Sequence, residues 1–128
     1  MSKSAETLVG LFEAAKAAQA KAYAPYSRFN VGAAILTPSG AIYAGCNVEN
    51  AAYPVGTCAE AGAIAAMIAA GGRRVAAILV CGDGAGLVTP CGACRQRIRE
   101  FAGPEGVVRT FTLAELLPES FGPETLGE

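Results

Sequence analysis

The stretch from residue 57 to residue 72 of this 128-residue chain reads TCAEAGAIAAMIAAGG, and it is the strongest indication of the fold class. The apolar run from Cys58 to Ala70, ended by Gly71 and Gly72, predicts a helix. Glu60 is its one charged residue. Because a helix that is apolar all round is buried all round, we expect a sheet to cover one face of it and another subunit to cover the rest.

The segments on either side of this helix supply the other elements of a layered domain. An amphipathic helix is predicted over residues 4–21, with Ser4 as its N-cap, and another helix over residues 90–101. The strand-like apolar runs of the chain occupy residues 29–37, 41–48, 75–81 and 107–113. Pro38-Ser39-Gly40 joins the first two runs as a hairpin. This order predicts an α/β fold, with a mixed sheet sandwiched by helices, in one domain spanning residues 1–128.

Composition limits the classes of function. The chain is 52% hydrophobic and 16% charged, which favours an oligomer that hides apolar surface. The longest apolar run, residues 61–72, is well short of the roughly 20 residues that span a bilayer. Glu6, Glu13 and Lys16 interrupt the N-terminal segment where a secretory signal would be apolar. We therefore expect a cytoplasmic protein that binds no membrane.

The charge balance argues against a polynucleotide partner. The net charge is −1 and the pI is about 5.5, whereas nucleic-acid binders carry basic patches. Arg95, Arg97 and Arg99 are spaced by two along a predicted helix, so we expect them to fan around it as solvated charge, and Arg73-Arg74 to be solvated as well.

Three of the five cysteines have the spacing of a metal site. Cys91 and Cys94 form a Cys-x-x-Cys pair at the start of a predicted helix, and Cys58 also opens a helix. Three protein ligands leave tetrahedral zinc one open position, which is typical of catalytic sites. Glu60 follows Cys58 by two residues and suits a group that moves protons from water activated by the metal.

Two other interpretations of these cysteines stay open at this point. The three thiols could be buried core residues at helix ends. Alternatively, Cys46 could complete a four-ligand structural zinc site, although Cys46 and Cys81 lie in strand-like runs and are better explained as buried thiols.

Five sequence blocks resemble the small homotetrameric zinc-dependent cytidine deaminases. They run from about residue 23 to residue 122: Tyr23-Ala-Pro-Tyr-Ser-Arg-Phe29-Asn-Val-Gly-Ala, Gly45-Cys-Asn-Val-Glu-Asn-Ala-Ala-Tyr53, Thr57-Cys-Ala-Glu60, Pro90-Cys-Gly-Ala-Cys-Arg-Gln96 and Leu116-Leu-Pro-Glu-Ser-Phe121-Gly. The resemblance implies a three-layer αβα fold, one zinc per chain and a homotetramer. It also implies hydrolytic deamination of cytidine and deoxycytidine to uridine and deoxyuridine, with release of ammonia, in pyrimidine salvage.

The resemblance also implies roles for individual residues. Glu60 is the catalytic proton shuttle, and Cys58, Cys91 and Cys94 hold the zinc. The residues expected to bind the nucleoside are Phe29, Asn47, Glu49, Ala51, Tyr53, Ala59 and Phe121. Asn47 and Glu49 would hold the ribose, the backbone N–H of Ala59 would face the base, and Tyr53 and Phe121 would reach a neighbouring subunit's site. A deaminase of aminonucleoside antibiotics is a related alternative, which the Asn47-Val-Glu49 ribose pattern disfavours.

Two departures from the family pattern carry expectations of their own. The stretch between Phe101 and Leu116 is short for the two strands usually found there, so an edge strand is expected to be shortened or lost. Ala61 stands where the family often has an arginine that offsets thiolate charge. Two helix N-termini could offset that charge instead. We therefore expect no other basic side chain to replace the arginine, and Ala61 to pack against the sheet or a neighbouring chain.

Overall fold

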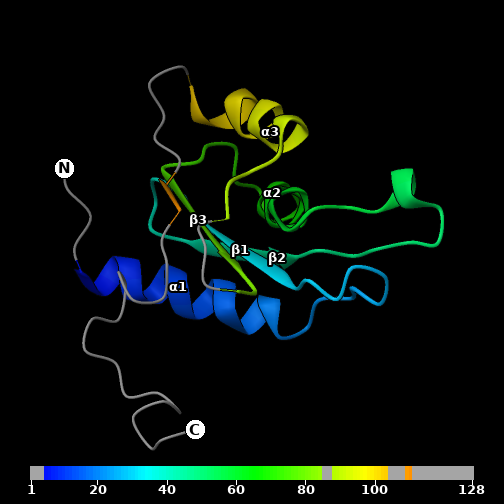
Figure 1. Ribbon diagram of the computed structural model, residues 1–128. Helices are drawn as coiled ribbons and strands as arrows, with labels where there is room; N and C mark the ends of the chain where they lie inside the picture. The colour runs from blue at the N-terminus through cyan, green and yellow to red at the C-terminus, as the bar shows by residue number, and fades with distance from the viewer. Residues whose placement is uncertain (1–4, 85–87, 104–108, 111–128) are drawn as a thin grey trace, which may run out of the picture.

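A four-stranded mixed sheet forms the middle layer of the part of the chain that the structure describes (Figure 1). The computed structural model describes residues 5–84, 88–103 and 109–110. The central strand β1 (Val31–Leu36) pairs antiparallel with β2 (Ile42–Cys46) and with β3 (Ala77–Gly82). At the far edge β4 (Arg109–Thr110) pairs parallel with β3, which confirms the predicted mixed sheet. The described edge strand is two residues long, and the end of the predicted run, residues 111–113, lies outside the described residues.

Helices cover both faces of this sheet. Helix α1 (Ala5–Gln19) lies on one face, and α2 (Ala59–Ala69) lies on the other, with α3 (Gly92–Ala102) beside α2 (Figure 1). The α/β fold with helices on both faces is therefore as predicted, with helix ends shifted by one or two residues. Ser4, the expected N-cap of α1, lies outside the described residues. Within the described residues, no helix has both the length and the apolar character that a membrane span requires.

The period-two alternation of the strands builds two separate apolar cores. On the α2 face the sheet contributes Ala33, Ile35, Ile78 and Val80, which are buried with Ala63, Met67 and Ile98 from the helices. On the α1 face it contributes Ala34, Leu36, Leu79 and Cys81, which are buried with Leu11 and Ala15. Successive strand residues point to opposite faces, so a continuously apolar strand can serve both cores at once.

Glycine at position 45 lets α2 lie unusually close to the sheet. A Cβ atom at Gly45 would lie 2.3 Å from the backbone nitrogen of Ala63 and 2.7 Å from the carbonyl oxygen of Ala59. Both distances are far below van der Waals contact, so no other residue fits here without moving the helix. The first turn of α2, which carries the predicted site residues, is therefore positioned against β2 by backbone contact.

The surface of α2 is only partly covered within one chain. Ala59, Glu60, Ala63, Ile64 and Met67 are buried, whereas the remaining residues of the helix are half-buried or exposed. The prediction that its own sheet covers one face is confirmed. The covering subunit stays a prediction about the assembled protein.

Candidate metal centre

Three cysteines meet where α2 and α3 begin. Cys58 is the N-cap of α2, Cys91 is the N-cap of α3, and Cys94 lies in the first turn of α3. Their three sulfur atoms all lie within 4.8 Å of one another, and the sulfurs of Cys58 and Cys91 are 3.8 Å apart. Tetrahedral zinc with Zn–S bonds of about 2.3 Å sets its thiolate sulfurs about 3.8 Å apart. The donor set and its spacing therefore fit one zinc ion.

The other two cysteines stand apart from this cluster. In the described part of the chain, no group of potential ligands other than Cys58, Cys91 and Cys94 comes together, and Cys46 and Cys81 are outside it. Cys81 is buried, as expected, and Cys46 in β2 is half-buried. A four-cysteine structural site involving Cys46 is therefore not formed, and three thiols leave a tetrahedral metal with an open position.

Burial and hydrogen bonding give the three thiols different acidities. Burial, followed by the charge of the neighbouring Glu60 carboxylate, raises the pKa of Cys94 to about 12. Burial also raises the pKa of Cys58. Cys91 is exposed, and the backbone N–H of Cys94 lowers the pKa of its thiol. The neighbouring sulfurs of Cys58 and Cys94 and the Glu60 carboxylate suit a bound cation, because a cation favours the charged form of each group.

Glu60 is a buried carboxylate on the wall of a cavity. Its side chain is 4% exposed, and within the described residues no hydrogen bond to it is found. The cavity has a volume of about 340 Å³. Its wall also contains Cys58 and Cys91, so metal ligands and carboxylate face the same space. Because no fully buried side-chain oxygen among the described residues lacks a hydrogen-bond partner, the carboxylate oxygens of Glu60 open onto the cavity, where a ligand or ion can reach them.

Of the residues expected to bind a nucleoside, four line this cavity: Asn47, Glu49, Tyr53 and Ala59. The cavity wall further includes Val31, Val48, Gly56, Thr57, Val88 and Thr89. Phe29 and Ala51 are not among the lining residues, and the ring of Phe29 lies against Gly82 instead. Phe121 lies outside the described residues. Val88 and Thr89 were not expected at the site, although their place just before Pro90-Cys91 could have indicated it.

Asn47 and Glu49 both brace the segment that leads into β1. The amide of Asn47 donates to the carbonyl oxygen of Phe29 at 2.8 Å and accepts from the N–H of Val31 at 2.9 Å. Glu49 Oε1 accepts from the N–H groups of Tyr26 and Ser27 at 2.9 and 3.1 Å, and Oε2 accepts from the Ser27 hydroxyl. These hydrogen bonds lower the pKa of Glu49, so its side chain is a fixed carboxylate near neutral pH.

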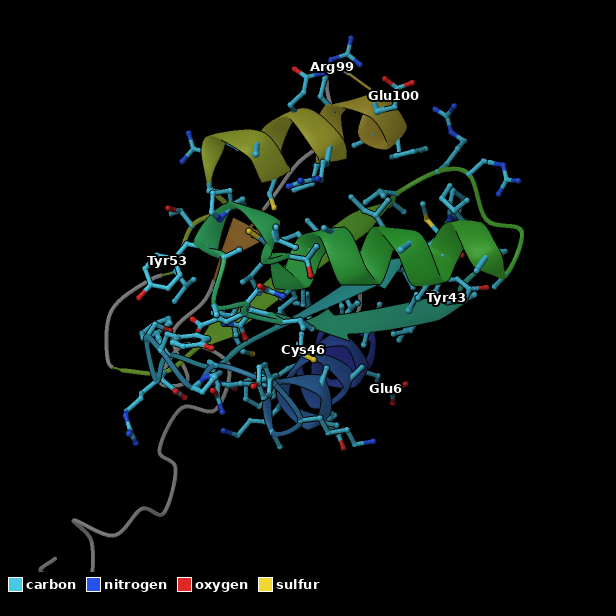
Figure 2. The ribbon with its side chains drawn as sticks, turned by 90° about the vertical axis from the view of Figure 1, so that its right-hand side faces the viewer. Glu6, Tyr43, Cys46, Tyr53, Arg99 and Glu100 are labelled. Carbon is cyan, nitrogen blue, oxygen red and sulfur yellow. The ribbon has the colours of Figure 1, made fainter. Side chains whose placement is uncertain are left out.

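Tyr53 extends from the molecule on η1 (Tyr53–Val55), a single turn at the tip of a long loop (Figures 1 and 2). Its side chain is 74% exposed, and its ring lies 5.8 Å from that of Tyr26. Tyr53 is also one of the residues that line the cavity.

The expectation that no basic side chain replaces the missing arginine is wrong. Nη1 of Arg97 donates to the sulfur of Cys94 at 3.4 Å. Residues three apart lie on the same face of a helix, and helical side chains lean toward the N-terminus, so Arg97 reaches back over Cys94. The spacing of the two residues in the sequence contained this signal. Ala61 is half-buried in α2.

Arg73 and Arg95 are exposed, in agreement with the expectation of solvated charge, and each also donates to the backbone. Nε of Arg95 donates to the carbonyl oxygen of Pro90 at 2.9 Å, which ties the first turn of α3 to the preceding loop. Nη1 of Arg73 donates to the carbonyl oxygens of Ile68 and Gly72 at 3.1 and 2.8 Å. Orphan carbonyl groups at a helix C-terminus attract such donors.

Comparison with known proteins places this geometry in a family. Residues 5–110 match the model of the cytidine and deoxycytidylate deaminase zinc-binding region. A cytidine deaminase of Sporosarcina psychrophila is 43% identical over 125 residues, covering 91% of this chain and 92% of that protein. A cytidine deaminase of Mycobacterium tuberculosis is 47% identical over 114 residues, covering 85% of each. The crystal structure of cytidine deaminase from Burkholderia pseudomallei superimposes with a TM-score of 0.74 at 46% identity, covering 88% of this chain and 98% of that one.

Proposed function

Because the chain belongs to the cytidine and deoxycytidylate deaminase family of zinc-dependent hydrolases, we propose that it converts cytidine and deoxycytidine to uridine and deoxyuridine. The observation that carries the proposal is the Glu60 carboxylate, which has no hydrogen bond among the described residues and shares one cavity with two of the three clustered thiols. In this reaction water adds to C4 of the base, the C4–N4 bond breaks, and ammonia leaves.

The three thiolates of Cys58, Cys91 and Cys94 would hold the zinc. When bound, zinc acts as a Lewis acid that makes water nucleophilic near neutral pH. Glu60 accepts one proton from the attacking water and passes it to N3 of the base, and it then accepts the proton of the new C4 hydroxyl group and passes it to the departing amino group.

Asn47 and Glu49 would hold the ribose with the hydrogen-bonding capacity that they have left. An amide group offers two donors and two acceptor sites, and the backbone of Phe29 and Val31 uses one of each. A carboxylate has about four acceptor sites, and the Tyr26-Ser27 segment uses three. Asn47 therefore keeps one donor and one acceptor site, and Glu49 keeps one acceptor site, for sugar hydroxyls. The free N–H groups at the start of α2, with that of Ala59, would face the base.

The remaining parts of the proposal concern the whole protein. We infer a single domain over residues 1–128, a homotetramer whose sites Tyr53 and Phe121 complete across interfaces, and a cytoplasmic protein of pyrimidine salvage. The exposed aromatic ring of Tyr53 beside the cavity and the partly uncovered α2 support shared sites. Among the described residues all the cysteines are free thiols, as in reducing compartments. Phe29 and Ala51, which do not line the cavity in one chain, are proposed to contact the nucleoside once it is bound.

The test is to incubate the purified, zinc-loaded protein with cytidine while ultraviolet absorbance and ammonia are followed together. We expect conversion to uridine with one ammonia released per base. Zinc-loaded protein that leaves both cytidine and deoxycytidine unchanged would refute the proposed activity.

A further inference from the structure

The side chain of Arg97 lies over the most deeply buried sulfur of the cluster. Cys94 has no exposed surface, and Nη1 of Arg97, one helical turn later, donates to its sulfur at 3.4 Å. A guanidinium group stays charged at every pH that a folded protein encounters. The contact is therefore a permanent positive charge against one thiol of the candidate metal centre.

The three sulfurs receive different hydrogen bonds. Cys91 is the N-cap of α3, and the backbone N–H groups of Cys94 and Ala93 in the first turn lower the pKa of its thiol. The sulfur of Cys94 receives the Arg97 side chain instead of such a backbone donor. The positive end of the α3 dipole is thus directed mainly at Cys91. Among the described residues, the cation that donates to the Cys94 sulfur is the Arg97 guanidinium, which adds a full positive charge to the partial charge of the helix N-terminus.

With zinc bound, the site has an excess of negative charge that a nearby positive charge would offset. Zn²⁺ with three thiolates sums to −1, which weakens the electron-withdrawing effect of the metal on its open position. The nearby Glu60 carboxylate adds further negative charge, close enough to act on Cys94. The neighbouring arginines do not serve, because Arg95 is bonded to the Pro90 carbonyl and Arg99 lies on the outer side of α3 (Figure 2).

We propose that Arg97 is a positioning residue that orients the Cys94 thiolate and neutralises its excess charge, in place of the arginine absent at Ala61. The inference rests on the proposed metal site and adds a residue to it that is not a ligand. In this chain Ala61 follows Glu60 in α2, and the cation that offsets the thiolate charge lies on α3 instead.

The test compares Arg97→Ala with the matched control Arg99→Ala, which removes the same charge from the outer side of the same helix. Zinc affinity is measured by competition with a chelator on the full chain. Removing a partner that supports a metal ligand typically weakens metal binding or activity by about 10–100-fold, and we expect this loss for Arg97→Ala and not for Arg99→Ala. In cobalt-substituted protein, the thiolate-to-cobalt absorption band should shift for Arg97→Ala alone.

The conservative variant Arg97→Lys tests whether charge is the cause. Because lysine keeps a positive charge on a long side chain, it should recover most of the zinc affinity lost in Arg97→Ala. Equal zinc affinity and an unchanged cobalt band in Arg97→Ala would overturn the inference, whatever the wild-type protein deaminates. Wild-type protein that binds zinc but leaves cytidine unchanged would instead refute the proposed function alone.

Discussion

At the scale of single residues, Glu60 is a carboxylate on a cavity wall with no hydrogen-bond partner in the part of the chain that the structure describes. Its side chain is 4% exposed and borders the space that Cys58 and Cys91 also face. Buried charged groups are normally paired. The arrangement therefore suits a group that exchanges protons with a ligand and is poorly explained as a packing residue.

Glu60→Gln tests this assignment with the smallest possible change. Glutamine keeps the size and polarity of the side chain but cannot accept and return a proton. We expect zinc content and thermal unfolding close to those of the wild type, and a rate of cytidine deamination lower by about 10²–10⁴-fold. Glu49→Gln is not a suitable control, because it disturbs the Tyr26-Ser27 segment. Wild-type turnover in Glu60→Gln protein would show that the proton takes another route.

Residue-level prediction from the sequence succeeded where spacing and chemistry coincide. Cys58, Cys91 and Cys94 were predicted as a cluster from Cys-x-x-Cys spacing and helix starts, and their sulfurs do come together. The Arg97–Cys94 contact contradicts the expectation that two helix N-termini offset the thiolate charge without a basic side chain. A long side chain turns back along its helix only where its surroundings allow it, and residue spacing alone does not specify those surroundings.

At the scale of elements, the close approach of α2 to β2 holds the first turn of α2, and with it Cys58 and Glu60, in place. The contact is backbone against backbone at Gly45. The order of elements was predictable, since the apolar runs, the Pro38-Ser39-Gly40 turn and the glycines after Ala70 mark them clearly. The close backbone contact at Gly45 was not predictable, because glycine in a strand equally suggests a bulge or a flexible point.

Gly45→Ala and Gly10→Ala form a matched pair of substitutions with opposite expected signs. At Gly45 the new methyl group meets the α2 backbone at 2.3 Å, so we expect a loss of about 1–3 kcal/mol or more in the free energy of unfolding. At Gly10, within α1, the nearest atom is Cδ1 of Ile42 at 3.7 Å, an ordinary contact. There alanine should stabilise the protein by about 0.5–1 kcal/mol, because glycine is a poor helix former.

Denaturant unfolding measures both variants on the same scale. If Gly45→Ala unfolded at the wild-type midpoint, α2 would have room to shift and the backbone contact would not position the site. Zinc content of the Gly45→Ala protein gives a second measure, since moving the start of α2 moves Cys58.

At the scale of the whole molecule, one chain leaves apolar surface beside its own cavity. Tyr53 and Val55 on η1 are 74% and 65% exposed, and parts of α2 are uncovered. The composition had indicated an oligomer, because the chain is 52% hydrophobic for its 128 residues. Neither composition nor a single chain gives the number of subunits, since that depends on how surfaces of separate chains match.

Light scattering coupled to size separation tests the proposed assembly. We expect a mass of four chains of 12.9 kDa each, and activity that falls together with that mass on dilution, because neighbouring subunits complete each site. A monomer with full deaminase activity would contradict the shared sites.

The central claim is a zinc centre held by three thiolates with one position open for chemistry. X-ray absorption at the zinc edge of the purified protein measures the ligands of the metal directly. We predict three sulfur atoms at about 2.3 Å and one oxygen or nitrogen at about 2.0–2.2 Å. The three sulfurs would belong to Cys58, Cys91 and Cys94. Four sulfur ligands and no light atom would make the centre structural and would contradict the account.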